Sequence, residues 1–353
     1  MIIGPAAIFN PFFIPPRLLH REKELKVAEA FLEDGINYQY PLHIVVTGIN
    51  GIGKTAFVNY LAEKIKDAYG FPKIFLNMHD SGSKYFLEKI VSDRNYSVIR
   101  NEVEYVSNGT YKDSFLVLVL DDVDPYSSLF RKVLRESKKR NMIVLASVDA
   151  RTLSKKSLSN LQTHLDFILK LGIYTPRQLF DITLQRVKLA FPIEIDIDVV
   201  RYITDLVCEF DINRPSVTIE MLRRLYPLVA SGMEITVEDV RKCSHDLLWI
   251  LNDDLVILEA LRNMKFESIL LLEKVASHFS RRPKKAYISL KELRDLHYLV
   301  CDEIEDEVAK YLFNECLEEL MDSEILFRSS FNRKYFYLAI PPRLLLNLIN
   351  ALF

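Results

Sequence analysis

A glycine-rich turn between an apolar run and a helical pattern constrains this chain more than any other feature. The run over 45–47 leads into Gly48, four residues follow, and Gly53-Lys54-Thr55 then opens a helical pattern over 56–66. In this order of strand, loop and helix, the spacing indicates a loop that binds phosphate. The alternative is a glycine-rich turn without a ligand. Glycines let the backbone curl, so that successive N–H groups and the helix N-terminus point at phosphate oxygens.

The side chains of this loop suit different parts of a nucleotide. Lys54 would reach the β- and γ-phosphates as a point charge, and the Thr55 hydroxyl would hold Mg²⁺. We therefore expect ATP or ADP with Mg²⁺ as cofactors. The expected binding residues run from the first loop glycine into the first helical turn: Gly48, Asn50, Gly51, Ile52, Gly53, Lys54, Thr55 and Ala56.

Carboxylates follow a second apolar run. Residues 114–120 read as a strand buried on both faces of a parallel sheet, and Asp121 and Asp122 end it. Asp121 would complete the Mg²⁺ site with Thr55, while Asp122 could polarise an attacking water. Asp122 and Lys54 are thus the catalytic candidates. Related ATPases more often carry Glu in the second place, so the shorter Asp122 predicts slow hydrolysis at most. Acidic residues after a strand are also common turn formers, which is the alternative.

Further strand patterns predict a parallel sheet around the loop. They cover 73–77, 141–149 and 165–171, with helical patterns over 19–32, 83–91 and 129–140, whereas 95–112 fits no element. In a doubly wound sheet the strand ends converge on the ligand, so Ser147 and Asp149 are candidates for sensing the γ-phosphate. A helix cap or a turn explains either residue equally well.

Length and composition indicate several folded domains. The chain has 353 residues, 49% of them hydrophobic and 27% charged, which is ordinary for globular proteins. Its net charge is −2, so any binding to DNA would have to come from a local basic patch. The four cysteines lack the spacing of metal ligands and fit reduced thiols. No apolar run reaches the ~18 residues of a membrane span, and the N-terminus lacks the basic start of a signal peptide. We expect a cytoplasmic protein with no membrane partner.

The second half of the chain is mostly helical. Patterns over 176–191, 197–209 and 217–229 predict a helical domain, in which Thr175 and Pro176 are good N-cap and N1 residues. A helical pattern continues over 236–263. Helices over 266–279, 289–300 and 304–322 and a hairpin over 324–338 then predict a winged helix-turn-helix. We expect domains over 1–172, 173–250 and 251–353.

Several stretches in this order resemble the Orc/Cdc replication initiators of the AAA+ class, with the archaeal layout. They are 17–25 before the loop, 120–124 at the acidic strand, 174–179 at the start of a helix, and the terminal winged helix. The resemblance covers about residues 15–346. It implies an α/β fold, with a RecA-like parallel-sheet ATPase core, a helical lid and a C-terminal winged helix domain.

The resemblance also implies a function. ATP or ADP would act as a conformational switch for binding double-stranded origin DNA and loading the replicative helicase, with other initiator subunits as partners. The location would be the cytoplasm of an archaeon or the nucleus of a eukaryote. Arg214 would be the family's sensor arginine, closing the lid on the γ-phosphate by charge-assisted hydrogen bonds. A surface arginine near a helix start is the alternative.

Three departures from the family pattern shape these expectations. The usual sensor asparagine is replaced by the sequence at 147–149, and 155–161 lacks the arginine that is often offered to a neighbouring subunit. The helix expected to enter the major groove, 302–322, holds nine acidic residues against Lys310. Phosphate repulsion would oppose base reading by this helix, because most duplex affinity comes from neutralising phosphates.

Basic side chains remain on the loop 280–285 and on the wing of the hairpin. They could grip backbone phosphates, or be solvated surface charges. These DNA candidates are Arg281, Arg282, Lys284, Lys285, Arg328, Arg333 and Lys334. The leading hypothesis is an ATP-binding initiator. The alternatives are an ATP-binding adaptor subunit, whose winged helix docks on protein with little DNA specificity, and a signalling ATPase with a winged helix.

Overall fold

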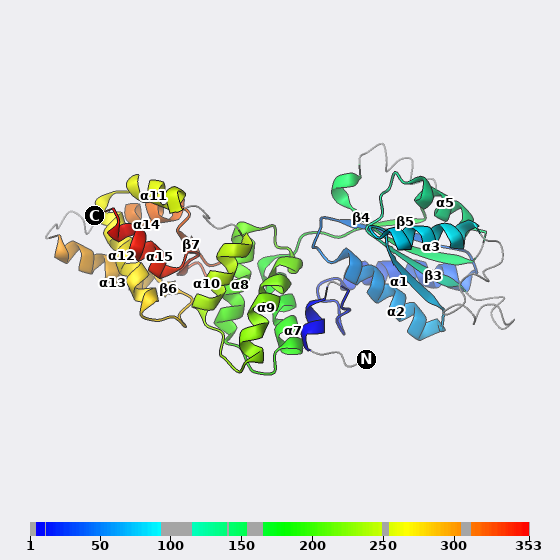
Figure 1. Cartoon of the computed structure of the whole chain (residues 1–353), viewed down its shortest axis with the longest axis horizontal. Helices are drawn as coiled ribbons and strands as arrows, with labels where there is room; N and C mark the ends of the chain where they lie inside the picture. The colour runs from blue at the N-terminus through cyan, green and yellow to red at the C-terminus, as the bar shows by residue number, and fades with distance from the viewer. Residues whose placement is uncertain are drawn as a thin grey trace. The chain divides into compact units, whose positions relative to one another are not determined.

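The computed structural model describes residues 5–10, 12–92, 115–139, 141–153, 165–248, 254–304 and 312–352 (Figure 1). The chain forms two compact units. The first comprises Asn10–Ile173, and the second comprises Met1–Phe9 together with Tyr174–Phe353. The stretch 95–112, which fitted no element, lies outside the described residues, as does the predicted domain limit at 250. Among the described residues, no helix combines the length and apolar character needed to cross a bilayer.

The first unit is built on a five-stranded sheet with the order β2-β3-β4-β1-β5, in which every pairing is parallel. The strands are β1 (His43–Gly48), β2 (Lys73–Asn77), β3 (Leu116–Asp121), β4 (Met142–Asp149) and β5 (Phe167–Lys170). β1 and β3 are buried at every position, which is why their sequences are continuous apolar runs. The parallel sheet predicted from these runs is confirmed.

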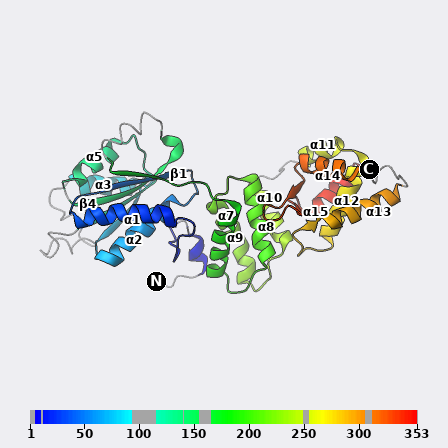
Figure 2. The ribbon, with the colours of Figure 1, turned by 180° about the vertical axis from the view of Figure 1, so that it is seen from behind.

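Helices cover both faces of this sheet. They are α1 (Glu22–Asn37), α2 (Lys54–Tyr69), α3 (Ser81–Ser92) and α5 (Ser128–Ser137), and the short 3₁₀ turn η2 (Ala150–Thr152) follows β4. A second 3₁₀ turn, η1 (Pro5–Phe9), belongs to the other unit and packs against its helices. Leu87 of α3 and Phe130 of α5 pack in a core with β2, β3 and β4. α1 and α2 cross the opposite face (Figure 2). This two-sided cover is what a sheet of wholly apolar parallel strands requires.

The start of α1 is tied to the end of the sheet. The sequence pattern placed this helix over 19–32, but it begins only at Glu22, because Arg21 is its N-cap residue. Arg21 is buried, and its guanidinium donates to the carbonyl of Gly172 at 2.6 Å and to Glu24 at 2.9 Å. The stretch 17–25 therefore fixes α1 to the chain that leaves β5.

The second unit begins with the predicted helical lid. Its helices are α7 (Pro176–Ala190), α8 (Ile197–Phe210), α9 (Pro215–Ala230) and α10 (Val237–Leu248). Thr175 caps α7 as predicted, because its hydroxyl accepts the N–H of Gln178, whose side chain in turn accepts the N–H of Thr175. The single helical pattern over 236–263 is divided between α10 and a separate helix, α11 (Asp254–Arg262), with 249–253 outside the described residues.

The winged helix follows. It contains α12 (Phe266–Ser280), α13 (Leu290–Glu303), α14 (Phe313–Asp322) and α15 (Pro342–Asn350), with strands β6 (Ile288–Ser289), β7 (Leu326–Arg328) and β8 (Tyr335–Leu338). The predicted hairpin is β7 and β8, and β6 adds a third strand beside β8 that the sequence did not indicate. A strand of two residues gives no readable alternation of apolar side chains.

The helix predicted over 302–322 is wrong in extent. Asp302 and Glu303 end α13, and α14 begins only at Phe313, whose ring lies 5.4 Å from that of His297. Residues 305–311 lie outside the described residues. α13 ends with Ile304 as its C-cap residue, whose N–H donates to the Val300 carbonyl at 3.1 Å. Within α14 four acidic residues remain: Glu315, Glu318, Glu319 and Asp322.

A buried carboxylate joins the wing to the lid. Asp205 of α8 accepts hydrogen bonds from the Ser329 hydroxyl at 2.6 Å, the Ser330 N–H at 2.8 Å and the Tyr287 hydroxyl at 2.9 Å. The Phe331 ring of the wing meets Phe180 of α7 at 5.5 Å. Burial raises the pKa of Asp205, and the hydrogen bonds lower it in part. Lid and wing therefore share one buried polar network.

Replacing Asp205 tests this network. Asp205→Ala would leave three donors without their acceptor, so we expect the free energy of unfolding to fall by roughly 3 kcal/mol or more. Asp205→Asn keeps an acceptor and removes the charge. Because the folded pKa is raised above the unfolded value of 3.8, the wild type should lose stability relative to Asp205→Asn as pH rises from about 4 through the folded pKa.

Denaturant unfolding measured across pH checks both expectations. The control is Asp198→Asn, which removes an exposed carboxylate near the start of the same helix. Equal unfolding free energies for Asp205→Ala and this control would contradict a structural role for the network.

Candidate nucleotide-binding site

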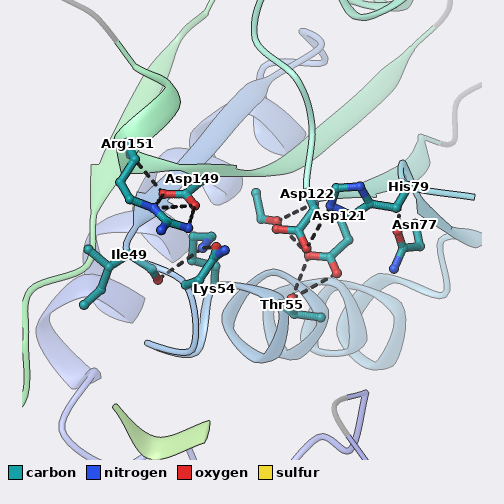
Figure 3. A network of polar contacts seen from close by, with 11 residues as sticks. Ile49, Lys54, Thr55, Asn77, His79, Asp121, Asp122, Asp149 and Arg151 are labelled. Carbon is teal, nitrogen blue, oxygen red and sulfur yellow. Dashed lines mark hydrogen bonds and ion pairs between the residues drawn. The ribbon is translucent and has the colours of Figure 1, made fainter. Parts of the chain in front are cut away.

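The predicted phosphate loop connects β1, which lies between β4 and β5 in the sheet, to α2 (Figure 3). Gly51 and Gly53 have φ of 80° and 98°, in the left-handed region that favours glycine. A Cβ atom at Gly48 would come within 2.9 Å of the Ile52 side chain and 3.3 Å of the Leu171 carbonyl oxygen. The three glycines are therefore required by the path of the loop.

The loop ends in the free N-terminus of a helix. α2 starts at Lys54 with Gly53 as its N-cap, so no side chain caps the first N–H groups, which include those of Thr55 and Ala56. Together with the curled loop before it, this helix start can hold an anion. The structure thus brings the predicted binding residues over 48–56 together around one turn.

Lys54 is poised inside the loop. Its side chain is almost fully buried, and Nζ donates to the Ile49 carbonyl at 3.2 Å and to the Asn50 side chain at 3.1 Å. Burial lowers the pKa of Lys54, while the nearby carboxylates of Asp122, Asp149 and Asp121 raise it in part. The lysine is therefore held at the loop by neutral acceptors that a phosphate could replace.

Asp121 forms the centre of the polar contacts. Its carboxylate accepts hydrogen bonds from the Thr55 hydroxyl at 2.7 and 3.0 Å and from the Ser147 hydroxyl at 2.6 Å. Only 2% of Asp121 is exposed, and burial raises the pKa of its carboxyl, whereas the bonds from Ser147 and Thr55 lower it in part. Three elements, β3, α2 and β4, meet at this side chain.

The pair Thr55 and Asp121 fits a magnesium ion. A hydroxyl and a carboxylate are the hard oxygen donors that Mg²⁺ takes from proteins, and Mg²⁺ usually completes its shell with phosphate oxygens and water. Among the described residues, no group of three or more His, Cys, Asp or Glu side chains is placed to hold a metal. Mg²⁺ at this position would therefore depend on a bound phosphate.

Ser147 lies behind Asp121. It is fully buried, and its hydroxyl donates to Asp121 and accepts the N–H of Asp122 at 2.8 Å. A side chain with no exposed surface would act on a ligand through Asp121. Its sensing of a γ-phosphate stays a prediction.

Asp122 occupies an unusual backbone conformation. Its φ of 52° is in the left-handed region, where Asp is tolerated better than Glu or other longer residues. Its carboxylate lies 3.7 Å from Nε2 of His79, which follows β2 and is exposed. Sequence reasoning missed His79, because the closeness of the ends of β2 and β3 depends on the strand order. The role of Asp122 as a base stays a prediction.

Asp149 lies beside the first glycine of the loop. It pairs in register with Gly48 across β1 and β4, and its carboxylate holds the guanidinium of Arg151 at 2.6 to 3.2 Å. These bonds lower the pKa of Asp149. Arg151 was also missed from the sequence. An Asp and an Arg two residues apart are a common surface pattern, and only the strand register places them at the loop.

Arg214 belongs to the second unit. It is the N-cap residue of α9, and its guanidinium forms an ion pair with Asp211, with Nε 2.7 Å from the carboxylate. The preceding Asn213 has a φ of 55° and donates to the carbonyl of Tyr174 at 2.9 Å. The contact of Arg214 with a nucleotide stays a prediction.

Most cations of the loop after α12 have acidic or histidine neighbours. Lys284 lies 2.5 Å from Glu234, Lys285 pairs with Glu292, and Arg282 lies 3.1 Å from His278. Arg281, the remaining cation of this loop, is exposed.

The wing differs, because Arg333 and Lys334 are exposed and have no acidic partner among the described residues. Arg328 lies over the ring of Phe336 at 5.2 Å. Of the predicted DNA contacts, Arg333 and Lys334 are thus the best placed.

Ser147→Ala tests the centre of the site. It would leave the Asp122 N–H without its acceptor and remove a donor from Asp121, which should lower the free energy of unfolding by about 1–3 kcal/mol. It should also weaken Mg²⁺-dependent nucleotide binding, because Asp121 loses part of its orientation. Denaturant unfolding and nucleotide titration with and without Mg²⁺ measure the two effects.

Ser137→Ala is the matched control for this variant. Ser137 is also fully buried, and its hydroxyl bonds to His43 at 2.7 Å, away from Asp121. A loss of Mg²⁺-dependent affinity as large in Ser137→Ala as in Ser147→Ala would contradict the assignment.

Comparison with known proteins gives partial sequence matches. No protein-family model matches the chain. It is 26% identical over 124 residues to the ORC1-type DNA replication protein 1 of Sulfurisphaera tokodaii, which covers 32% of this chain and 31% of the relative. It is 34% identical over 56 residues to the ORC1-type DNA replication protein 2 of Haloarcula marismortui, covering 16% and 14%. The chain thus matches less than a third of either relative's length.

The fold comparison covers almost the whole chain. Cdc6p from Pyrobaculum aerophilum aligns with a TM-score of 0.73 at 19% identity, over 98% of this chain and 97% of that one. The Aeropyrum pernix ORC2 protein aligns at 0.56 with 16% identity, and its ORC1 protein at 0.53 with 18% identity, each over 98% and 96%. The fold is therefore an AAA+ RecA-like core with a helical lid and a winged helix. Partial sequence similarity and full-length fold similarity together confirm the resemblance of this chain to the Orc/Cdc6-type replication initiators.

Proposed function

We propose that this chain binds ATP with Mg²⁺ and acts as a DNA replication initiator of the origin recognition type, switching conformation with its nucleotide. The observation that carries the proposal is the arrangement of Lys54, Thr55 and Asp121 around an uncapped helix N-terminus at the end of β1. The likeness to the ORC2 protein of Aeropyrum pernix, whose structure holds ADPNP and ADP, supports it.

Each residue of the site has a distinct task in this proposal. The N–H groups from Gly48 to Ala56 would hold the phosphates, and Lys54 would bind the β- and γ-phosphate oxygens. Thr55 and Asp121 would hold Mg²⁺, which would neutralise part of the phosphate charge. Arg214 would contribute a further cation from the lid.

The conformation of Asp122 favours binding over fast turnover. Its short side chain and left-handed backbone give it less reach towards an attacking water than a glutamate in a regular strand end. We therefore propose that ATP is hydrolysed slowly, and that the ATP and ADP states serve as a switch for DNA binding and helicase loading.

For DNA, we propose that the wing grips the duplex through its backbone phosphates. Arg333 and Lys334 are the cations that face solvent, while α14 is acidic and unsuited to the negative major groove. The ORC1 protein of Aeropyrum pernix, which shares the fold, was solved in complex with DNA. Binding here should be mainly independent of sequence.

A second candidate function is an ATP-binding adaptor subunit of an initiator complex. The acidic α14 favours it, because Glu318 and Asp322 add negative charge where a DNA-reading helix would be basic. In that case the winged helix would dock on a basic protein surface. Other initiator subunits and the replicative helicase are the proposed partners, in the cytoplasm.

Lys54→Ala tests the nucleotide site. Removing charge-assisted hydrogen bonds to phosphate should weaken ATP binding at least about tenfold. Titration with a fluorescent ATP analogue measures the affinity. Lys64→Ala is the control, since Lys64 lies on the same helix and pairs with Glu29. Unchanged affinity in Lys54→Ala would remove the basis of the proposed function.

Arg333→Glu with Lys334→Glu tests the DNA surface. We expect duplex affinity to fall at every sequence tested, and the slope of log affinity against log salt to flatten by about 2, since two phosphate contacts are lost. Titrations of labelled duplex at several salt concentrations measure both quantities. The control is Lys284→Glu, whose cation is already paired. Unchanged duplex binding together with lost binding to an initiator subunit would favour the adaptor function.

A further inference from the structure

Asp149 and Arg151 form an ion pair beside the phosphate loop. Asp149 ends β4 opposite Gly48, and its carboxylate lies close enough to Lys54 to affect the pKa of the lysine. Arg151, in the short turn η2, contacts both carboxylate oxygens through Nε and one through Nη2 at 2.6 Å. The N–H of Arg151 donates to the same carboxylate at 2.9 Å. Figure 3 shows the pair next to Lys54 and Ile49.

Carboxylates near the loop oppose the binding of a highly charged anion. Asp121, Asp122 and Asp149 all lie near the single lysine of the loop. Mg²⁺ held by Thr55 would offset Asp121, whereas the charge of Asp149 is offset mainly by Arg151, with a smaller contribution from Lys54. An uncovered Asp149 would repel a phosphate, and the repulsion would grow with the number of phosphates.

The geometry of Arg151 suits a covering role. Its guanidinium forms a forked contact along the carboxylate, which is the strongest arrangement for such a pair. η2 is only one turn long and starts directly after β4, with Asp149 as its N-cap residue. This turn keeps the side chains of Arg151 and Asp149 close together. The Asp149 carboxylate also accepts the backbone N–H, so both of its oxygens are engaged.

Folding stability gives little reason for the pair. The Arg151 side chain is 69% exposed, and exposed ion pairs contribute little to stability. The carboxylate of Asp149 already caps η2 through the backbone N–H, without any help from the guanidinium. A function for the guanidinium itself therefore has to be sought at the neighbouring loop.

We propose that Arg151 is a positioning residue that neutralises Asp149, so that the loop accepts the terminal phosphate of a nucleoside triphosphate. The pair then determines the preference for a triphosphate over a diphosphate. This inference rests on the proposed ATP site and specifies how that site tolerates a carboxylate in the sensor position.

The experiment compares the affinities of a non-hydrolysable ATP analogue and of ADP, both with Mg²⁺, in four full-length proteins. Arg151→Ala should weaken binding of the ATP analogue about ten- to thirty-fold, as expected for one uncovered charge several ångströms away at an effective dielectric constant of about 20. ADP affinity should fall by a smaller factor, because ADP has one phosphate group fewer for the uncovered carboxylate to repel. Asp149→Asn should bind the ATP analogue at least as well as the wild type.

The double variant Asp149→Asn with Arg151→Ala decides the mechanism. If Arg151 acts by covering Asp149, the double variant should recover most of the ATP-analogue affinity, because no charge remains to be covered. A double variant as weak as Arg151→Ala would overturn the proposal, since Arg151 would then act on the phosphate itself. Equal losses of ATP-analogue and ADP affinity in Arg151→Ala would overturn it as well.

Two controls distinguish a failure of the proposed role of Arg151 from a failure of the proposed ATP site. Arg201→Ala removes the arginine of another exposed Asp–Arg pair, in the second unit, and should leave both affinities unchanged. Lys54→Ala reports on the proposed function. If the wild type binds ATP through Lys54 and Arg151→Ala binds it equally well, only the role of Arg151 is refuted. Thermal unfolding of each variant shows that the losses do not come from misfolding.

Discussion

The hydrogen bonds of the Asp121 carboxylate hold the candidate site together. They connect the end of β3 with Thr55 at the start of α2 and with Ser147 inside β4. A carboxylate with 2% exposure is costly in free energy unless its oxygens are hydrogen-bonded, and here hydroxyl groups supply those bonds. Hydroxyl donors stabilise the charge without cancelling it. Asp121 is therefore oriented without being paired to a fixed cation, which leaves it available to hold one.

Asp205 in the second unit is also a buried carboxylate held by hydrogen bonds, but it joins two domains. Its donors are again hydroxyl groups and one N–H, from Ser329, Tyr287 and Ser330, but all of them come from the winged helix. The bonds link domains within the unit instead of shaping a ligand site. Because the wing shares these bonds with α8, we expect the wing and the lid to move as one body if nucleotide acts as the proposed switch. A displacement of α8 would then move the wing with it.

The sequence predicted the sheet and the loop well, because both depend on strong local rules. Wholly buried parallel strands must be continuous apolar runs, and a loop that curls around phosphate must place glycine at left-handed positions such as Gly51 and Gly53. The helix predicted over 302–322 was wrong in extent, because apolar spacing alone did not show that α13 ends at Glu303 and that α14 begins at Phe313. β6 was missed because two residues carry no periodicity.

The sequence predicted only those residues of the site that belong to a recognisable motif. His79 and Arg151 belong to no motif, and their position near the loop follows from which strand ends are neighbours: β2 beside β3, and β4 beside β1. The hydrogen bond from Ser147 to Asp121 was not predicted, since a sequence cannot show which way a buried hydroxyl points.

Under the proposed function, the charge distribution implies that nucleotide and DNA would be recognised by different means. At the loop, carboxylates outnumber cations, so binding of an anion depends on backbone N–H groups, on Lys54 and on neutralising pairs such as Asp149 with Arg151. At the wing, the cations Arg333 and Lys334 lie on the surface, while the acidic α14 gives no counterpart for base reading. A loop of fixed backbone N–H groups selects a ligand by its shape. Exposed Arg and Lys side chains that contact phosphates select for negative charge and do not distinguish DNA sequences. Specificity in this protein should therefore be high for the nucleotide and low for the DNA sequence.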